Sequence, residues 1–343
     1  MDYKKYQELF RKKAIDAGYS EDNIIKCLSY AEKLISRKLP VIYNSSHLAA
    51  LVGYKRSYIK RAIYHTKYFY RTFSIKKKNG KKREISEPLP SLKEIQDWIL
   101  NNILYIRKNN RFAKAYIPQK TIVDNIKFHI NQPIVLCVDI QDFFHSITLQ
   151  SVQEIFVEFG YSLRVAEVLA KLCCLEGHLP QGAPTSPQLS NIYMHSFDTS
   201  VAKYCVNKQI RYTRYADDLT FSGNFDDIEV LSFVSQNLNA IGLKINPEKT
   251  KVMTSNMRQI ITGIVVNKKA QIPKEKRREL RQAIYYIKKF GLESHLEKVQ
   301  CNKSNYLKHL LGIANYFLFI NPNDNTLKEE KKYLIDLYKQ QKR

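Results

Sequence analysis

The chain has 343 residues, and its 56 Lys and Arg residues against 32 Asp and Glu residues give a formal net charge of +24. Such a cationic excess favours a polyanionic partner, because cationic side chains gain affinity by releasing counterions from phosphates. No apolar run approaches the roughly 18 residues of a membrane span, so no transmembrane helix is expected.

The length predicts two or three lobes around a shared core rather than one compact unit. The N-terminal sequence MDYKKYQELFRKK is charged from its start and is unlike a secretory signal. The six cysteines form neither a CxxC pair nor a zinc spacing. We therefore expect reduced thiols, a cytoplasmic location and no membrane partner.

Residues 1–72 have the apolar spacing of helices, as in Ile24, Leu28 and Ala31. Within them, residues 46–52 and 57–65 predict two short helices around a turn at Gly53. A plain helical hairpin and a DNA-reading helix-turn-helix are both open interpretations of this pair.

The spacing of apolar residues is no longer helical over residues 70–87, where the basic run KKKNGKKR separates two apolar stretches. Because Asn-Gly is a strong hairpin signal, this segment predicts a β-hairpin with a basic tip. An amphipathic helix follows, carried by Leu92, Ile95, Ile99 and Ile103.

The run IVLCVDI at residues 134–140 predicts a central, buried strand that carries Asp139 near its end. The capping-box pattern from Ser151 to Glu154 predicts the start of the next helix. Residues 163–174 predict another helix, residues 179–187 an irregular loop, and residues from about 187 to 204 a further helix.

Two strands at residues 210–215 and 219–222 flank Ala216-Asp217-Asp218, which predicts a tight hairpin with acids at its tip. A helix is expected from about residue 228 to Gly242, and one more strand over residues 260–266. From Pro273 onward the pattern is helical and basic.

Asp139, Asp217 and Asp218 form the candidate catalytic group. An acid that ends a buried strand is costly unless it is paired or binds a metal, and two adjacent acids repel each other. If the two strands are neighbours, three carboxylates meet at one end of a sheet and offer the hard oxygen ligands that Mg²⁺ prefers. The alternative is that Asp217-Asp218 forms only a polar turn.

Four motifs in order resemble those of reverse transcriptases and together cover roughly residues 70–270. Tyr-Ala-Asp-Asp at residues 215–218 is similar to the catalytic motif, and VDIQDFFHSI at 138–147 to the first acidic motif. LPQGAPTSPQLSN at 179–191 resembles the nucleotide-pocket loop, and GLKINPEKT at 242–250 the segment after the catalytic hairpin.

The resemblance implies an α+β right-hand polymerase fold with fingers, an antiparallel-sheet palm and a helical thumb. The implied domains are an N-terminal helical region (1–69), fingers (70–133), a palm (134–267, with finger helices inserted around 150–180) and a basic helical thumb (268–343).

The resemblance also implies an RNA-directed DNA polymerase in which Asp139, Asp217 and Asp218 hold two Mg²⁺ ions. The implied contacts of the incoming deoxynucleotide triphosphate are Arg83, Lys81, Phe144, Gln181, Gly182 and Lys249. Phe144 would act as a steric gate against the ribose 2′-hydroxyl, and Lys249 would neutralise or protonate pyrophosphate. Each of these roles has an alternative. Phe144 would pack in the core, Lys81 would lie at a solvated hairpin tip, and Lys249 would be a plain surface lysine.

The closer resemblance is to bacterial retron reverse transcriptases. Their Asn-Ala-x-x-His motif is matched by Asn125 and His129, with Ile in place of Ala, and their Val-Thr-Gly motif by Ile261-Thr262-Gly263. The implied RNA-binding residues are Asn125, His129, Thr262, Gly263, Arg277, Arg278, Arg281 and Lys288. An ordinary packing histidine is the alternative for His129.

Membership would imply a cognate non-coding RNA that serves as template and primer, and extension from an RNA 2′-hydroxyl into a short branched DNA (msDNA). It would also imply phage defence together with an effector protein. A group II intron-like enzyme, for whose maturase domain the segment after Asp218 leaves little room, is an alternative. So are a diversity-generating or abortive-infection reverse transcriptase, and a protein that mainly scaffolds nucleic acid and effector.

Overall fold

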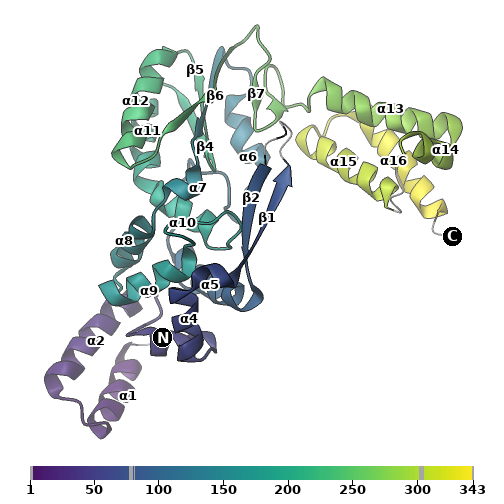
Figure 1. The fold of residues 1–343 in the computed structure, drawn as a ribbon. Coiled ribbons are helices and arrows are strands. Elements are labelled where there is room, and N and C mark those ends of the chain that lie inside the picture. The colour runs from purple at the N-terminus through teal and green to yellow at the C-terminus, as the bar shows by residue number, and fades with distance from the viewer. Residues whose placement is uncertain (1–2, 77–79, 81, 301–304, 342–343) are drawn as a thin grey trace. The chain divides into compact units, whose positions relative to one another are not determined.

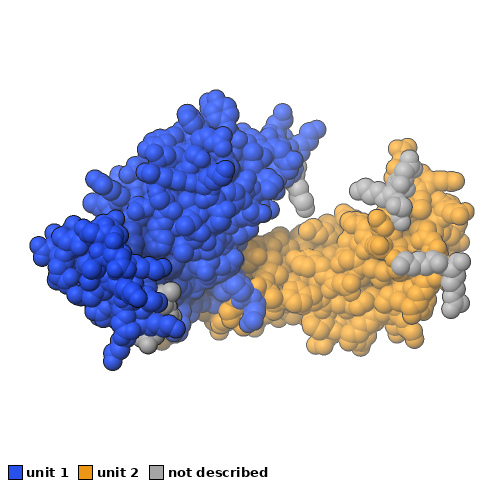
Figure 2. All heavy atoms as spheres, turned by 90° about the horizontal axis from the view of Figure 1, so that it is seen from below, with its two compact units in different colours: residues 1–119, 140–203, 232–246 blue, residues 120–139, 204–231, 247–343 orange. Residues whose placement is uncertain are grey.

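The computed structural model describes residues 3–76, 80, 82–300 and 305–341. It contains helices and antiparallel strands, labelled in Figure 1. The chain divides into two compact units, coloured separately in Figure 2. Unit 1 contains residues 1–119, 140–203 and 232–246, and unit 2 contains residues 120–139, 204–231 and 247–343.

Unit 1 begins with the helices α1 (Tyr3–Asp16), α2 (Glu21–Ser36), α3 (Ser45–Val52), α4 (Arg56–Tyr64) and the 3₁₀ helix η1 (Thr66–Phe69). Ala14, Ile24 and Leu28 are buried where α1 and α2 pack together. Gly53 ends α3 with a φ of 76°, a left-handed conformation that glycine adopts without steric cost. The predicted helical start and the paired short helices are confirmed, although the strand already begins at Tyr70.

The predicted hairpin consists of β1 (Tyr70–Lys76) and β2 (Lys82–Pro88), which pair antiparallel with Phe73 opposite Ile85. The tip residues Lys77, Lys78, Asn79 and Lys81 lie outside the described residues. After the hairpin, α5 (Pro90–Asn102) buries Leu92, Ile95 and Ile99, as the amphipathic spacing predicts.

Two of the predictions for the helices that follow β3 (Ile134–Ile140) differ from the structure. The helix predicted to start at Ser151 starts earlier, because the Thr148 hydroxyl accepts a hydrogen bond from the Ser151 N–H (3.2 Å) and caps it. The helix predicted for residues 187–204 is two helices that meet at Met194. The elements are α7 (Phe143–Ser146), α8 (Leu149–Phe159), α9 (Leu163–Cys173), α10 (Ser186–Tyr193), α11 (His195–Asn207) and α12 (Asp227–Ala240).

A four-stranded sheet forms the centre of unit 2, in the order β4 (Arg211–Tyr215), β5 (Asp218–Gly223), β3 (Ile134–Ile140) and β6 (Ile245–Thr254). The helical turns α6 (Ile122–Ile126) and η3 (Lys127–His129) contact β4, and η3 also contacts β5. The strands β3, β4 and β5 confirm the prediction. The strand β6 was missed, because its sequence INPEKTKVMT contains a proline and exposed lysines, as is common at a sheet edge.

The strand predicted over residues 260–266 is instead a short hairpin of β7 (Ile260–Ile261) and β8 (Ile264–Val265). Thr262 and Gly263 form its turn with φ values of 46° and 84°. Two consecutive positive φ values fit a type I′ turn, which is why the apolar run reverses instead of continuing.

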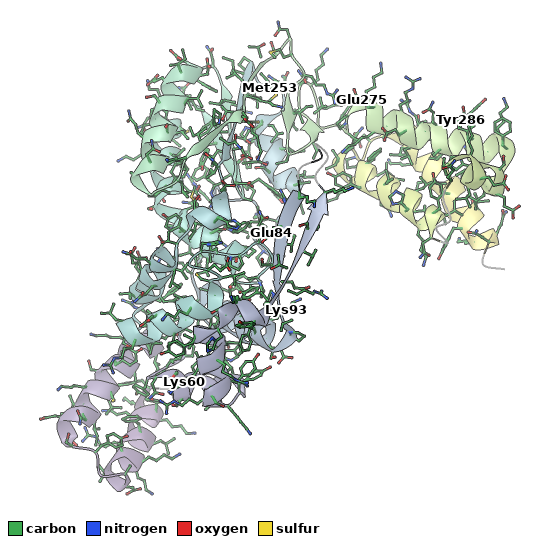
Figure 3. All side chains as sticks on the ribbon, viewed as in Figure 1. Lys60, Glu84, Lys93, Met253, Glu275 and Tyr286 are labelled. Carbon is green, nitrogen blue, oxygen red and sulfur yellow. The ribbon has the colours of Figure 1, made fainter. Side chains whose placement is uncertain are left out.

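The described residues after Pro273 form the helices α13 (Lys274–Phe290), α14 (Leu292–Lys298), α15 (Tyr306–Ile320) and α16 (Asn325–Gln340). Their core includes Leu280, Ile284, Leu310, Phe317 and Leu334. Figure 3 shows Glu275 and Tyr286 projecting from α13. The helical, basic C-terminal segment is confirmed. Over the described residues, none of the helices has the length and apolarity needed to cross a bilayer.

Candidate active site

The two strands that carry the predicted carboxylates are neighbours in the sheet of unit 2. Asp139 on β3 lies directly opposite Asp218 on β5. Tyr215 on β4 pairs with Asp218, so Ala216 and Asp217 form a two-residue turn between β4 and β5. The structure therefore brings the three acids to one end of the sheet, as the sequence predicts if the strands are adjacent.

The turn itself has an unusual backbone. Ala216 is buried and has a φ of 59°, a left-handed conformation that is costly for any residue with a Cβ. The guanidinium of Arg214, which is also fully buried, donates a hydrogen bond from Nη1 to the carbonyl oxygen of Ala216 (3.1 Å). Sequence reasoning missed this residue, although a cation within the strand sequence RYTRY is a signal that could have indicated it.

Charge is incompletely balanced in this group of acids. Burial, followed by the charges of Asp217 and Asp139, raises the pKa of Asp218 to about 7, and Lys249 acts in the opposite direction. Lys249 on β6 donates to both carboxylate oxygens of Asp139, at 2.9 and 3.0 Å. Burial by itself lowers the pKa of Lys249, but its hydrogen bond to Asp139 and the charges of all three acids raise it overall.

The raised pKa of Asp218 predicts that the metal-free protein loses stability as the pH rises. The folded state holds this proton up to about pH 7, whereas an ordinary Asp releases it near 3.8. Between these values the folded state binds more protons than the unfolded chain, so the free energy of unfolding falls with pH. Relative to wild type, Asp218→Asn should gain about 2–3 kcal/mol of stability between pH 5 and pH 8. Urea unfolding in EDTA measures this difference, and a constant difference across that pH range would contradict the prediction.

The donor chemistry of the three acids fits a divalent cation, since carboxylate oxygens are the ligands of Mg²⁺. Within the part of the chain that the structure describes, however, no group of three or more His, Cys, Asp or Glu side chains is already arranged to hold a metal ion. Asp139 is instead engaged by the Lys249 ammonium. The three acids therefore fit the ion by the chemistry of their ligand atoms.

The loop that carries Gln181 and Gly182 lies against the β1–β2 hairpin within unit 1. The Ser86 N–H donates to the carbonyl oxygen of Gln181 (2.7 Å). A Cβ on Gly182 would lie 2.7 Å from the carbonyl oxygen of Ser86, and the φ of Gly182 is 129°. Glycine is therefore required here by the close approach of β2 as well as by the backbone conformation.

Phe143 and Phe144 lie in different environments. Phe143 is 4% exposed and belongs to the core, whereas Phe144 is half-buried. The Phe144 ring lies 5.5 Å from that of Phe143 and 6.3 Å from that of Tyr116. Arg83 is exposed on β2, and Lys81 lies outside the described residues.

Asn125 and His129, which the sequence predicts to bind RNA, both have fully buried side chains in this structure. The Thr213 hydroxyl on β4 donates to Asn125 Oδ1 (2.7 Å), so Nε2 of His129 donates to Thr213 Oγ1 (2.8 Å). Nδ1 of His129 shares a hydrogen bond with Ser222 Oγ on β5 (2.7 Å). These two residues hold the strands of the catalytic hairpin together, as a buried packing histidine would.

The other predicted RNA-binding residues lie on the β7–β8 turn and on α13. Thr262 and Gly263 form the β7–β8 turn, with Thr262 half-buried and Gly263 exposed. Exposed cationic side chains follow α13, and the ammonium of Lys288 lies 4.9 Å from the ring centroid of Tyr333. On α13, Arg277 is half-buried, and the exposed residues are Arg278, Arg281 and Lys288.

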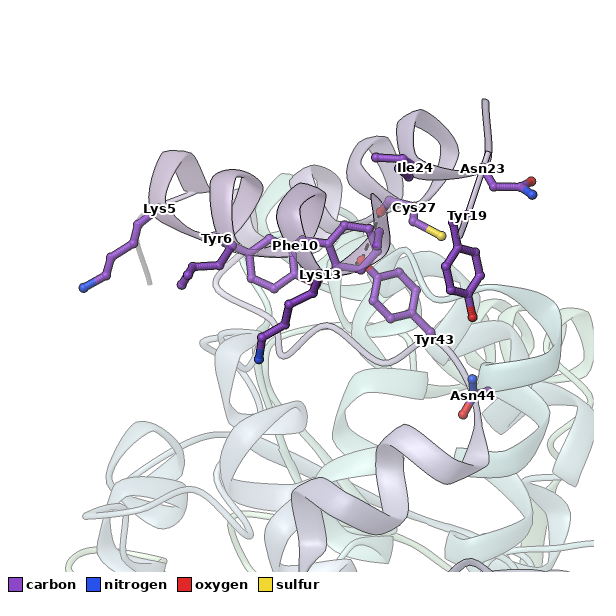
Figure 4. Close-up of a pocket in the computed structure, with 12 residues that line it drawn as sticks. Lys5, Tyr6, Phe10, Lys13, Tyr19, Asn23, Ile24, Cys27, Tyr43 and Asn44 are labelled. Atoms are coloured by element: carbon purple, nitrogen blue, oxygen red, sulfur yellow. Dashed lines mark hydrogen bonds between the residues drawn. The ribbon is translucent and has the colours of Figure 1, made fainter. Parts of the chain in front are cut away.

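A cavity of about 1010 Å³ lies elsewhere, among the N-terminal helices of unit 1 (Figure 4). Its lining comes from α1, α2 and the segment at Tyr43, and it includes Tyr6, Phe10 and Ile24. Among the described residues that line it, none is a predicted site residue. Cavity size therefore does not locate the active site in this chain.

Comparisons with known proteins agree with these motifs. The family described as reverse transcriptase (RNA-dependent DNA polymerase) matches residues 75–311. The Retron Ec86 reverse transcriptase of Escherichia coli is 31% identical, over 86% of this chain and 92% of that protein. The Retron Mx65 reverse transcriptase of Myxococcus xanthus is 30% identical, over 83% of this chain and 70% of that protein. The Retron Ec83 reverse transcriptase of Escherichia coli is 28% identical, over 77% of this chain and 90% of that protein.

The family match includes both strands that carry the acids and the loop at Gln181. It confirms the α+β right-hand polymerase fold and the enzyme class that the four motifs imply. These relatives match between 77% and 86% of the chain, which agrees with the narrower resemblance drawn from Asn125, His129 and the Thr262-Gly263 turn. The chain therefore belongs to the retron reverse transcriptases and is an RNA-directed DNA polymerase.

Proposed function

We propose that this polymerase makes a short branched DNA (msDNA) from a cognate structured RNA that serves as both template and primer. The observation that carries the proposal is Asp139 directly opposite Asp218, with Asp217 in the adjoining turn. A retron enzyme with these three acids has the groups needed to extend DNA from an RNA hydroxyl, here a 2′-hydroxyl.

In this proposal Asp139, Asp217 and Asp218 hold two Mg²⁺ ions. When bound, such ions activate the attacking hydroxyl and stabilise the leaving oxygen. The protein contributes the position of the acids, which the pairing of β3 with β5 and the β4–β5 turn determine. Burial at the end of the sheet also reduces the screening of these charges by water.

The roles proposed for the other residues follow their chemistry. Arg83, together with Lys81, contacts the triphosphate, because a guanidinium binds phosphate in bidentate fashion. Gln181 and Gly182 line the incoming nucleotide, and Phe144 excludes a ribose 2′-hydroxyl. Lys249 neutralises the pyrophosphate that leaves. The exposed cations of α13 and the Thr262-Gly263 turn bind RNA, with residues 268–343 serving as the thumb.

We place residues 70–133 in the fingers, residues 134–267 in the palm and residues 1–69 in an N-terminal helical region. The proposed setting is the cytoplasm, where the enzyme, its RNA and its DNA product act with an effector protein in phage defence. The net charge of +24 supports a large nucleic-acid partner.

The central proposal predicts a specific DNA in cells that express the chain with its adjacent non-coding locus. Total nucleic acid should contain a short, abundant DNA whose apparent mass falls after treatment with a debranching enzyme. A DNA product whose apparent mass is unchanged by the debranching enzyme would contradict priming from a 2′-hydroxyl. No such DNA, with the RNA present and the protein soluble, would contradict the msDNA proposal itself.

A further inference from the structure

The contact between Lys249 and Asp139 occupies the group that a catalytic metal would need. The Lys249 ammonium lies 2.9 Å from one carboxylate oxygen of Asp139 and 3.0 Å from the other. A contact this symmetric engages both oxygens at once, where a divalent ion would otherwise bind. The Asp139 carboxylate therefore already has a cation in this structure.

The architecture of the sheet produces this contact. β3 lies between β5 and β6, so Asp139 has a carboxylate neighbour on one side and the strand of Lys249 on the other. The acid and the lysine are 110 residues apart in sequence, and strand order alone brings them together. A cation from β6 thus compensates part of the negative charge that β3, β5 and the turn accumulate.

We infer that Lys249 is an internal counter-cation of the metal-free enzyme, which must release Asp139 before this carboxylate can bind a divalent ion. The inference rests on the proposed metal-dependent function of the three acids. Lys249 would then set how much divalent ion the enzyme needs.

The exposure of the two partners makes such an exchange feasible. The side chain of Lys249 is 57% exposed, whereas that of Asp139 is 10% exposed. The lysine can therefore swing into solvent without disturbing the sheet, and an ion pair with one exposed member is held weakly. Once released, the same ammonium is available to a phosphate group near the acids.

A purely structural role for the pair has a different consequence. If Lys249 only fixed β6 to β3, its loss would loosen Asp139 and weaken any metal site there. If Lys249 competes with the ion, its loss strengthens binding. The sign of the change in metal affinity therefore separates the two roles.

The test measures Mn²⁺ binding to the full chain in the absence of nucleic acid and nucleotide. The electron paramagnetic resonance signal of free Mn²⁺ reports how much of the ion is bound. Lys249→Met removes the charge and keeps the length of the side chain. Lys251→Met is the matched control, since Lys251 is exposed on the same strand two residues away. Asp139→Asn, combined with each protein, identifies the binding that depends on this acid.

Lys249→Met should lower the dissociation constant of the Asp139-dependent site by about two- to tenfold, and Lys251→Met should change it by less than about twofold. Unchanged or weaker binding in Lys249→Met would overturn the inference while leaving the metal site intact. An equal fall of the Mn²⁺ dissociation constant in both lysine variants would also overturn the inference, because the loss of any nearby positive charge would then explain the tighter binding. Absence of Asp139-dependent binding in every protein would overturn the proposed metal function as well.

Discussion

Replacing Asp217 by Asn should abolish DNA synthesis while leaving the fold intact. The substitution keeps the shape of the side chain in the two-residue turn but removes one of the three charges that meet there. Loss of a carboxylate from a two-metal site should lower the rate of nucleotide addition by at least about a thousandfold, or about 4 kcal/mol of transition-state stabilisation. A primer-extension assay on an RNA template with Mg²⁺ and deoxynucleotides measures it.

Stability measurements distinguish lost chemistry from lost structure. The charge of Asp217 is one of the causes that raise the pKa of Asp218, so its removal relieves repulsion in the folded state. Metal-free Asp217→Asn should therefore be at least as stable as wild type at pH 8. Asp336→Asn, an exposed change on α16, is the control and should retain full activity. Substantial synthesis by Asp217→Asn would remove this residue from the catalytic group.

The same variant separates catalysis from scaffolding in cells. If phage defence requires the DNA product, Asp217→Asn should eliminate both the DNA and the protection. Protection that persists with no DNA made would indicate that the chain acts in defence by holding RNA and effector. That outcome would concern only the role in defence, and the wild-type protein would still be a DNA polymerase.

The catalytic strands could be predicted because their local sequences carry the signal. A strand buried on both faces is apolar throughout, so an acid at the end of IVLCVDI stands out against its neighbours. The turn between β4 and β5 is equally local, since only two residues separate the two strands. Local sequence therefore marks Asp139, Asp217 and Asp218 as candidates, and the pairing of β3 with β5 brings them together.

Features that depend on pairing between distant segments could not be predicted in this way. β6 has no apolar alternation, because it lies at an edge and exposes much of its length. Without that strand, nothing in the sequence brings Lys249 to Asp139. The close approach of Ser86 to Gly182 is likewise a contact between strand β2 and a loop far away in sequence.

The burial of Asn125 and His129 shows a further limit of pattern reasoning. Polar residues at positions i and i+4 suggest an exposed helix face. Here the chain passes from α6 into η3, and both side chains point into the sheet of unit 2. Their partners are hydroxyl groups on strands about 90 residues later, which no local pattern reveals.

Replacing His129 by Ala should consequently destabilise the protein rather than remove an RNA contact. The imidazole bonds to the hydroxyl groups of Thr213 and Ser222, both fully buried, and joins β4 to β5. Removing it takes a buried partner from Ser222, at a cost of about 1–3 kcal/mol, and one of two partners from Thr213, which keeps its hydrogen bond to Asn125. The free energy of unfolding should fall by about 2–4 kcal/mol, measured by denaturant unfolding followed by circular dichroism.

His309→Ala is the matched control, because His309 is exposed on α15 in the same unit, and it should change stability by less than about 0.5 kcal/mol. At a temperature where His129→Ala is still folded, its affinity for the partner RNA should equal that of wild type. Its DNA synthesis should fall, since the strands that carry Asp217 and Asp218 lose their common anchor. A variant with wild-type stability and weakened RNA binding would instead restore the direct RNA contact that the motif suggested, and would require His129 to leave the interior when RNA binds.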